Sequence, residues 1–347
     1  RAIEKNSHAY RPLGLGYANL GALLMSRGLP YDGDTGRDYA GAITAVMTGE
    51  AYAQSARVAR DHGGPFAGYA ANREPMLRVM RKHRDAIKGI NQKNVPADLY
   101  NGARQSWDEA VELGEDFGYR NAQATVLAPT GTIGFMMDCD TTGIEPDLGL
   151  VKFKKLVGGG NMQIVNQTVP RALRKLGYTT TQIDDIVAYI DREKTIIGSP
   201  HLAAEHVPVF ACSMGDNTIH YEGHVRMMGA TQPFLSGAIS KTVNMPEEAS
   251  IEDIEALHQL SWELGLKAVA VYRDNCKVGQ PLSTGKKDGE GVDTPTSMAS
   301  QTVERIVERL VHQPIRQKLP RTRSARTFEF RVADCNGFAN IGEYADG

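Results

Sequence analysis

The sequence predicts an α/β fold, and three observations indicate this class. Several stretches repeat apolar residues at helical spacing. Short β-prone runs lie between them, and the run 267–272 (Lys-Ala-Val-Ala-Val-Tyr) follows a predicted helix that ends at Gly265. Its apolar residues are largely unalternated, which is typical of a parallel strand buried on both faces. Glycine accounts for 36 of the 347 residues, which favours many tight turns over a plain helical bundle.

Helices make up most of the predicted elements. The first is expected over 15–27, where small residues allow close packing, and Gly28 ends it. Asp34 is placed to cap a second, longer helix that continues to about Arg60. At 250–253 a Ser is followed three residues later by an acid, which is a capping box that begins the last predicted helix. The further helices are predicted over about 74–89, 98–116, 166–176, 181–193, 216–230 and 250–264.

The composition changes near residue 283 and divides the chain into three regions. Residues 283–301 contain almost no large apolar side chain and are interpreted as a flexible linker. Beyond them, alternating apolar residues from Phe328 and a favoured Asn336-Gly337 turn predict a β-hairpin. We therefore predict a main domain over 1–282, then the linker, then the truncated start of an accessory domain over 302–347.

Charge and cysteine spacing exclude several classes of protein. The 39 lysines and arginines nearly balance 41 aspartates and glutamates, which excludes the blanket positive field of a protein that coats nucleic acid. No apolar run reaches the roughly 18 residues that span a membrane, and no signal segment is present, so a cytoplasmic protein without a membrane or nucleic-acid partner is expected. The basic run 316–326 is either a solvated linker face or a contact for RNA or a nucleotide tail. The cysteines are too widely spaced for a disulfide framework or a local zinc site: Cys139, Cys212, Cys276 and Cys335.

One loop carries the strongest chemical signal. A β-prone run, 124–127, enters a segment with one proline, two threonines and two glycines. Such a loop can aim backbone N–H groups and hydroxyls at one anion, and its glycines allow a phosphate to approach closely. A plain turn that ends a strand is the alternative, and the polar stretch 138–146 downstream either lines a pocket or forms a surface loop. The candidate phosphate-binding residues are Pro129, Thr130, Gly131, Thr132, Ile133 and Gly134.

Other motifs are weaker. The glycines at 14–19 imitate a dinucleotide fingerprint, but no strand precedes them. Residues 279–286 imitate a phosphate-binding loop with the wrong glycine spacing. Asp32 and Asp34 begin like a calcium loop that lacks its acidic twelfth position, so they are better read as a turn and helix cap. Histidines at 201, 206, 220 and 224 lack a partner that completes a ligand set, so no metal site is expected.

Several longer motifs together resemble the adenosylcobalamin-dependent (class II) ribonucleotide reductases. They occur in the order of that family, at plausible spacing, over nearly the whole chain. The matching motifs are 10–19 (Tyr-Arg-Pro-Leu-Gly-Leu-Gly-Tyr-Ala-Asn), 128–134 (Ala-Pro-Thr-Gly-Thr-Ile-Gly), 142–146 (Thr-Gly-Ile-Glu-Pro), 238–244 (Ala-Ile-Ser-Lys-Thr-Val-Asn) and 267–274 (Lys-Ala-Val-Ala-Val-Tyr-Arg-Asp).

The resemblance implies a fold, a reaction and a cofactor. The fold would be the second half of a ten-stranded α/β barrel with additional helices, built in the family from two half-barrels of parallel strands. The reaction would be reduction of ribonucleotides to 2′-deoxyribonucleotides by a thiyl radical, with adenosylcobalamin as cofactor and a thioredoxin-like dithiol protein as reductant. The family's loop that matches 129–134 holds the substrate phosphate groups. Whether diphosphates or triphosphates are reduced, and whether the enzyme is a homodimer, stays open.

The catalytic core of the family is missing from the match. The chain has no Asn-x-Cys-x-Glu motif, and none of its cysteines matches a radical or reducing cysteine, so no catalytic residue is assigned. Cys139 is close enough to Thr132 in sequence for a redox role, or it is an inert packed thiol. The chain alone is therefore expected to be inactive and to need an N-terminal half, as a split subunit or as part of a longer gene product. A non-catalytic half-barrel subunit and an unrelated phosphate-binding α/β protein are the competing interpretations.

Overall fold

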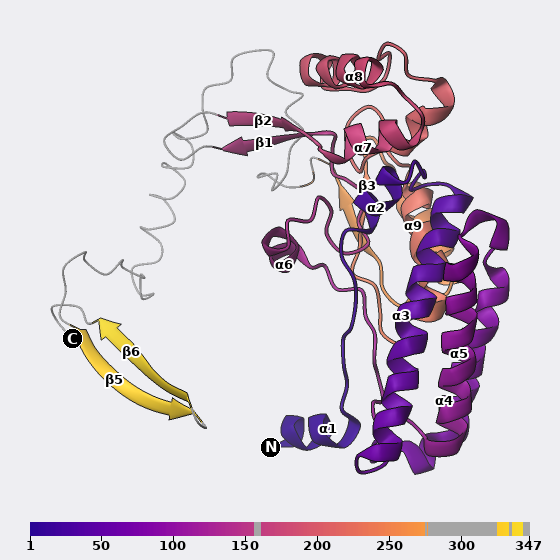
Figure 1. Cartoon of the computed structure of the whole chain (residues 1–347), viewed down its shortest axis with the longest axis vertical. Coiled ribbons are helices and arrows are strands. Elements are labelled where there is room, and N and C mark those ends of the chain that lie inside the picture. Colours follow the sequence, from indigo (N-terminus) through magenta and orange to yellow (C-terminus); the bar gives the residue numbers. More distant parts are fainter. Residues whose placement is uncertain (156–160, 275, 277–324, 333–334, 343–347) are drawn as a thin grey trace. The chain divides into compact units, whose positions relative to one another are not determined.

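The computed structural model describes residues 1–155, 161–274, 276, 325–332 and 335–342. The chain divides into two compact units, Arg1–Lys286 and Lys287–Gly347, and each is considered by itself. Most of the described helices and strands belong to the first unit (Figure 1).

Three long helices form the largest packed layer of the first unit (Figure 1): α3 (Asp34–Asp61), α4 (Tyr69–Ala86) and α5 (Ala97–Phe117). The face of α3 toward α5 is rich in small residues, which lets the two backbones approach closely. A Cβ atom at Gly49 would lie 2.9 Å from the Cβ of Ser106, so this contact requires glycine. The aromatic rings of Tyr52, Trp107 and Tyr119 fill the space further along the same interface.

Extended segments beside these helices run parallel to one another. Leu15 forms a parallel bridge with Thr125, and Leu127 forms one with Ile239. After Ile239 the chain continues into β3 (Thr242–Met245), which pairs in parallel with β4 (Ala270–Arg273). The predicted parallel arrangement is therefore present, and helices connect its members as in an α/β protein.

The expected burial of both faces of the strand at 267–272 is wrong. Val243 and Met245 of β3 are buried, but Ala270 of β4 is exposed and the other three residues of β4 are only half-buried. Among the described strands β4 pairs with β3 alone, which makes it an edge strand, so its apolar run did not indicate burial on both faces.

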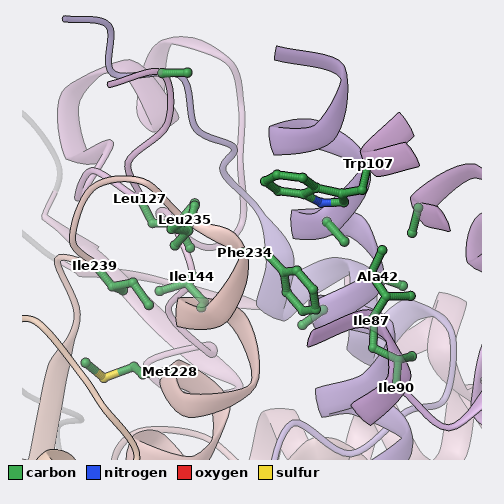
Figure 2. Close-up of a cluster of buried hydrophobic side chains, with 14 of the residues drawn as sticks. Ala42, Ile87, Ile90, Trp107, Leu127, Ile144, Met228, Phe234, Leu235 and Ile239 are labelled. Carbon is green, nitrogen blue, oxygen red and sulfur yellow. The ribbon is translucent and has the colours of Figure 1, made fainter. Parts of the chain in front are cut away.

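A core joins the extended segments to the helical layer. Figure 2 shows Leu127, Ile144 and Leu235 gathered beside the extended segments, with Phe234 reaching toward Ile87 at the end of α4. All five side chains are at least nine-tenths buried. The extended segments and the helices therefore share one hydrophobic core.

The start of the chain departs from the prediction. Helix α2 (Leu20–Ser26) begins five residues later than expected, because Leu13 and Leu15 are extended and donate hydrogen bonds to the carbonyls of Gln123 and Ala124. It ends as predicted, with Gly28 at φ 72°. Helix α1 (Ala2–Tyr10) was not predicted.

The predicted cap at Asp34 is also wrong. Asp34 is the first residue of α3, the capping position is Gly33, and no side chain caps this helix. The Asp34 carboxylate instead accepts a hydrogen bond from Arg37 at 2.7 Å, and Asp32 accepts another from the same guanidinium at 2.7 Å. A salt bridge to a neighbouring arginine has replaced the bond to a backbone N–H.

The later helices lie close to their predicted ranges, and Ser250 caps the last one through a bond from the N–H of Asp253. These helices are α7 (Thr168–Lys175), α8 (Thr180–Glu193), α9 (Tyr221–Thr231) and α10 (Ile251–Glu263). Short 3-10 turns occupy Ile87–Gly89, Gln92–Asn94, Ala204–Phe210 and Gln232–Phe234. Among the helices in the described ranges, none has the length and hydropathy needed to cross a membrane.

Most residues of a smaller second core lie between α6 and α9 in the sequence. The antiparallel pair β1 (Val151–Lys155) and β2 (Asn161–Val165) leads into α7 and α8 (Figure 1). Buried apolar side chains of this core include Leu173, Ile186 and Phe210. The two ends of the segment that contains β1, β2, α7 and α8 are bonded to each other, because the N–H of Ser213 donates to the carbonyl of Asp147 at 2.8 Å. Its β-pair was not predicted.

The second unit contains the antiparallel pair β5 (Ala325–Val332) and β6 (Cys335–Gly342). The predicted turn at Asn336-Gly337 is wrong, because both residues lie within β6 and pair with Arg331 and Phe330. The register places Val332 opposite Cys335, so strand pairing outweighs the local turn preference of Asn-Gly. The predicted linker, 283–301, and the imitation phosphate loop, 279–286, lie outside the described residues.

Candidate functional site

The predicted phosphate loop is partly helical. After the extended run that ends at Leu127, Thr130 adopts a left-handed conformation at φ 50° and precedes the short helix α6 (Gly131–Met136). The first helical bond runs from the N–H of Gly134 to the carbonyl of Thr130 at 2.7 Å. As at any helix start, the preceding N–H groups have no acceptor within the helix. These N–H groups remain available to a ligand, although the segment is not the open loop that its glycines indicated.

Open space surrounds the start of α6. A Cβ atom built on Gly131 meets no other heavy atom within 4 Å. Thr132 is exposed, whereas Gly134 is buried, and a Cβ atom built on it would lie 3.4 Å from the methyl group of Thr142. Of the two predicted glycines, therefore, only Gly131 leaves room for a ligand, and Gly134 serves packing.

The segment 141–146 packs against the turn at Thr130 and holds it by hydrogen bonds. The N–H of Gly143 donates to the hydroxyl of Thr130 at 2.6 Å. Gly143 has φ 50°, and a Cβ atom there would lie 2.7 Å from the carbonyl oxygen of Ala128, so this position requires glycine on both counts. The N–H of Thr141 donates to the side-chain oxygen of Asn19 at 3.0 Å. Three of the sequence motifs, 10–19, 128–134 and 142–146, thus meet at one place.

A buried ion pair connects this support to β3. The ammonium of Lys241 donates to Glu145 Oε2 at 2.6 Å and to the carbonyl of Thr242 at 2.9 Å. Glu145 Oε1 accepts a bond from the N–H of Thr242 at 2.8 Å. The Lys241 side chain is fully buried and that of Glu145 is 22% exposed. Burial lowers the pKa of Lys241, and the adjacent Glu145 carboxylate opposes that shift.

Tyr31 and His224 lie against the ion pair. The Tyr31 hydroxyl donates to the carbonyl of Ile144 at 2.6 Å, and its ring lies 5.8 Å from the Lys241 ammonium. Burial raises the pKa of Tyr31 well above its ordinary value, and the charge of Glu145 adds to the effect. His224 is fully buried with its ring centroid 6.3 Å from that of Tyr31. Burial, reinforced by the charge of Lys241, lowers the pKa of His224 well below 6.5. This histidine is therefore neutral at pH 7.

Sequence reasoning assigned no partner to Lys241 and did not anticipate Tyr31. The available signal was a lysine inside the otherwise apolar and small-residue run 238–245, since lysine is rarely buried without a partner. Glu145 lay in another motif, and only the tertiary structure brings the two together.

The histidines do not gather into a metal site within the described part of the chain, where no group of three or more His, Cys, Asp or Glu residues could hold an ion. His220 is at the start of α9, where its ring nitrogen accepts a bond from the N–H of Glu222, whereas His224 is buried. His220 and His224, which are four residues apart in the sequence, thus have different environments and do not form a pair of metal ligands.

Cys139, Cys212 and Cys276 form no disulfide bond within the described part of the chain. Cys139 is half-buried beside α6, and its N–H donates to the carbonyl of Gly134 at 2.9 Å. Cys212 is buried in the second core, and Cys276 is exposed. Cys139 is therefore the one cysteine among them that adjoins the predicted phosphate site.

The glycines at 14–19 serve packing. A Cβ atom on Gly16 would lie 2.3 Å from the carbonyl oxygen of Val126, so the chain passes too close to the neighbouring segment for any side chain. A glycine at this position explains the resemblance to a dinucleotide fingerprint without a nucleotide.

Comparison with known proteins identifies the class. The family model described as the ribonucleotide reductase barrel domain matches residues 1–272, and the chain belongs to this family. Among its relatives, the vitamin B12-dependent ribonucleotide reductase of Streptantibioticus cattleyicolor is 52% identical over 345 residues. The proteins of the same name from Streptomyces avermitilis and Rhodopirellula baltica are each 51% identical, over 346 and 349 residues.

These matches cover 99% of this chain but 56%, 36% and 33% of the three relatives. The chain thus spans between about a third and just over half of the length of these relatives. The class predicted from the sequence motifs is confirmed.

Proposed function

We propose that this chain is part of a vitamin B12-dependent ribonucleotide reductase and that it supplies half of the catalytic barrel. The observation that carries the proposal is identity of about 50% along 99% of the chain to proteins that bear this name. The parallel extended segments, from Leu15 to β4, fit a half-barrel of parallel strands. In this proposal the relatives' additional length corresponds to the other half, which completes a ten-stranded barrel.

In this function the start of α6 binds the substrate phosphates. The backbone N–H groups at Gly131 and Thr132 would donate to phosphate oxygens, and the exposed Thr132 hydroxyl would add a further donor. The open space around Gly131 supports this assignment, because a phosphate needs to approach the backbone closely. Holding the phosphates fixes where the ribose lies, and fixed geometry is a large part of the rate that an enzyme provides.

The relatives' name implies adenosylcobalamin as cofactor, and one feature of the chain fits it. Exposed apolar side chains of α6, namely Ile133 (50% exposed), Phe135 (82%) and Met136 (77%), offer a surface suited to the largely apolar face of a corrin ring. When bound, the cofactor supplies the radical that starts reduction. These residues of the chain would hold and shield it.

The reacting cysteines lie outside this chain in the proposal, because the chain contains no Asn-x-Cys-x-Glu. A dithiol protein of the thioredoxin kind is the proposed reductant. The test is to mix this chain with a matching N-terminal half, adenosylcobalamin and a ribonucleotide, and to measure deoxyribonucleotide formation. We expect deoxyribonucleotide to form only when both halves are present. Turnover by this chain without the other half would contradict the proposal.

A single substitution tests the phosphate site. Gly131→Val leaves the fold intact, since nothing lies near the added side chain, but it occupies the space that a phosphate would use. We expect nucleotide affinity, measured by equilibrium dialysis on the complete gene product, to fall by about tenfold or more. Gly89→Val is the matched control, because a Cβ atom there also meets nothing within 4 Å and the residue lies in a 3-10 turn away from α6. Equal affinities in wild type and Gly131→Val would contradict the assignment.

A further inference from the structure

We propose that Glu145 and Lys241 are positioning residues that set the place of the phosphate-binding turn relative to the parallel strands. The inference rests on the proposed function and deepens it, because it assigns a task to two residues that do not themselves contact the substrate. A chain of contacts connects β3 to Thr130 through residues 142–145.

The first step is the anchor on β3. Glu145 uses both carboxylate oxygens, one for the Lys241 ammonium at 2.6 Å and one for the N–H of Thr242 at 2.8 Å. Lys241 closes the arrangement by donating to the carbonyl of Thr242 at 2.9 Å. Three charge-assisted bonds, two of which reach the backbone of Thr242, therefore hold Glu145 and Lys241 at the first residue of the strand.

The second step links Glu145 to the phosphate turn. The N–H of Glu145 donates to the carbonyl of Thr142 at 2.9 Å, which makes residues 142–145 a compact turn. Within it, the N–H of Gly143 donates to the Thr130 hydroxyl at 2.6 Å. The side chain of Ile144 is fully buried, and its carbonyl accepts a hydrogen bond from the Tyr31 hydroxyl. The turn is thus tied to β3 on one side and to Thr130 on the other.

The third step concerns why a charged pair is used. A fully buried ammonium is expensive to desolvate, and an apolar pair of similar volume is often as stable or more stable. What an apolar pair lacks is direction, because dispersion contacts do not fix one oxygen opposite one N–H. The bonds of Glu145 to the strand backbone do fix it, so the pair suits positioning better than it suits stability.

The test compares binding of a ribonucleotide with binding of its nucleoside, in the complete gene product, by equilibrium dialysis. The variants are Glu145→Gln and the double variant Glu145→Leu/Lys241→Met, which leaves no unpaired buried charge and so keeps the fold. We expect both to bind the ribonucleotide about tenfold more weakly, and the nucleoside within about twofold of wild type, since only the phosphate contacts depend on the turn. Lys267→Met is the matched control, because Lys267 also donates to backbone carbonyls, of Leu235, Ser236 and Gly237, but has no contact with the turn.

The outcomes separate the inference from the proposed function. If wild type prefers the nucleotide and the double variant keeps that preference, or loses affinity for both ligands alike, the positioning role is overturned and the phosphate site stands. If wild type itself binds nucleotide and nucleoside equally, the phosphate site is wrong, and the inference fails with it. A lost preference in Lys267→Met would likewise overturn the inference, because the loss of a lysine that bonds backbone carbonyls away from the turn would then have the same effect.

Discussion

Gly131 and Gly16 show how one residue type meets opposite needs in this molecule. Gly131 has empty space where a side chain would be, whereas Gly16 lies against the carbonyl oxygen of Val126. In the sequence both glycines lie in motifs that resemble phosphate-binding loops. The sequence could not show that Gly16 serves packing, because its close neighbour Val126 lies more than a hundred residues away. Lys241 is a similar case, since its partner Glu145 lies 96 residues earlier in the chain.

Cys212 provides a residue-scale prediction about the thiols. It is buried in the second core, where its Sγ lies 3.5 Å from the carbonyl of Phe210. Cys212→Ser should therefore leave the turnover of the reconstituted enzyme nearly unchanged, and the more polar hydroxyl should lower the free energy of unfolding by about 1 kcal/mol. Steady-state assay and urea unfolding measure the two effects. A collapse of turnover in a folded variant would show that this cysteine takes part in the reaction.

The elements of this chain differ in how far local sequence determines them. Long amphipathic helices such as α5 and α8 match their predicted ranges within a few residues, because their apolar spacing is a local signal, and α8 also begins with a capping box of Thr179 and Gln182. The segment that forms α6 was expected to be a loop, because its glycines and threonines are poor helix formers. Contacts with surrounding residues, such as the bond from the N–H of Gly143 to the Thr130 hydroxyl, stabilise the helix instead. The extended segment at Leu15 was expected to be helical, because its partner, Thr125, is distant in sequence.

The contact of α2 with the support of the site gives a prediction at the scale of elements. A Cβ atom on Gly21 would lie 2.5 Å from the carbonyl oxygen of Glu145 and 2.8 Å from the Cα of Pro146. Gly21→Ala should therefore push the two segments apart and lower the free energy of unfolding by about 1–3 kcal/mol. Chemical denaturation measures this change.

Gly102→Ala in α5 is the matched control for that substitution. Its added methyl group meets only the Val46 side chain at 3.8 Å, so the variant should gain about 0.5–1 kcal/mol from its higher helix propensity. Opposite signs for the two alanines are the expected result. Equal stability of Gly21→Ala and wild type would show that α2 does not pack against residues 145 and 146 as described.

At the scale of the whole molecule, buried histidines couple stability to pH. His224 is held neutral by burial and by the charges of Lys241 and His220. His83 is also buried, and burial lowers its pKa from 6.5. The hydrogen bond of its Nδ1 to the carbonyl of Pro233 opposes this shift, whereas the charges of Lys267 and Lys82 add to it. In the unfolded chain each histidine takes up a proton near pH 6.5, whereas in the folded chain it does so only at lower pH.

The sign of the pH dependence follows from this difference. Below about pH 6.5 the unfolded state binds more protons than the folded state, so acidification stabilises the unfolded state. We expect the free energy of unfolding to fall below that pH by up to about 1.4 kcal/mol per pH unit for each histidine. Urea unfolding at about pH 7.5, 6.5 and 5.5 measures the slope. His224→Phe should make the slope shallower, and a slope identical to that of wild type would show that His224 does not contribute.

The parallel pairing of distant segments also bears on the order in which the chain can become structured during synthesis. Gln123, which bonds to Leu13, is synthesised 110 residues after it. Ser236, which bonds to Thr125, is synthesised 111 residues after that threonine. The first segment therefore waits without its neighbour while α3 and α5, which lie between the two in sequence, are made and can pack together. In the order of synthesis the helices are therefore available first as a template, and the extended segments can pair on them only later.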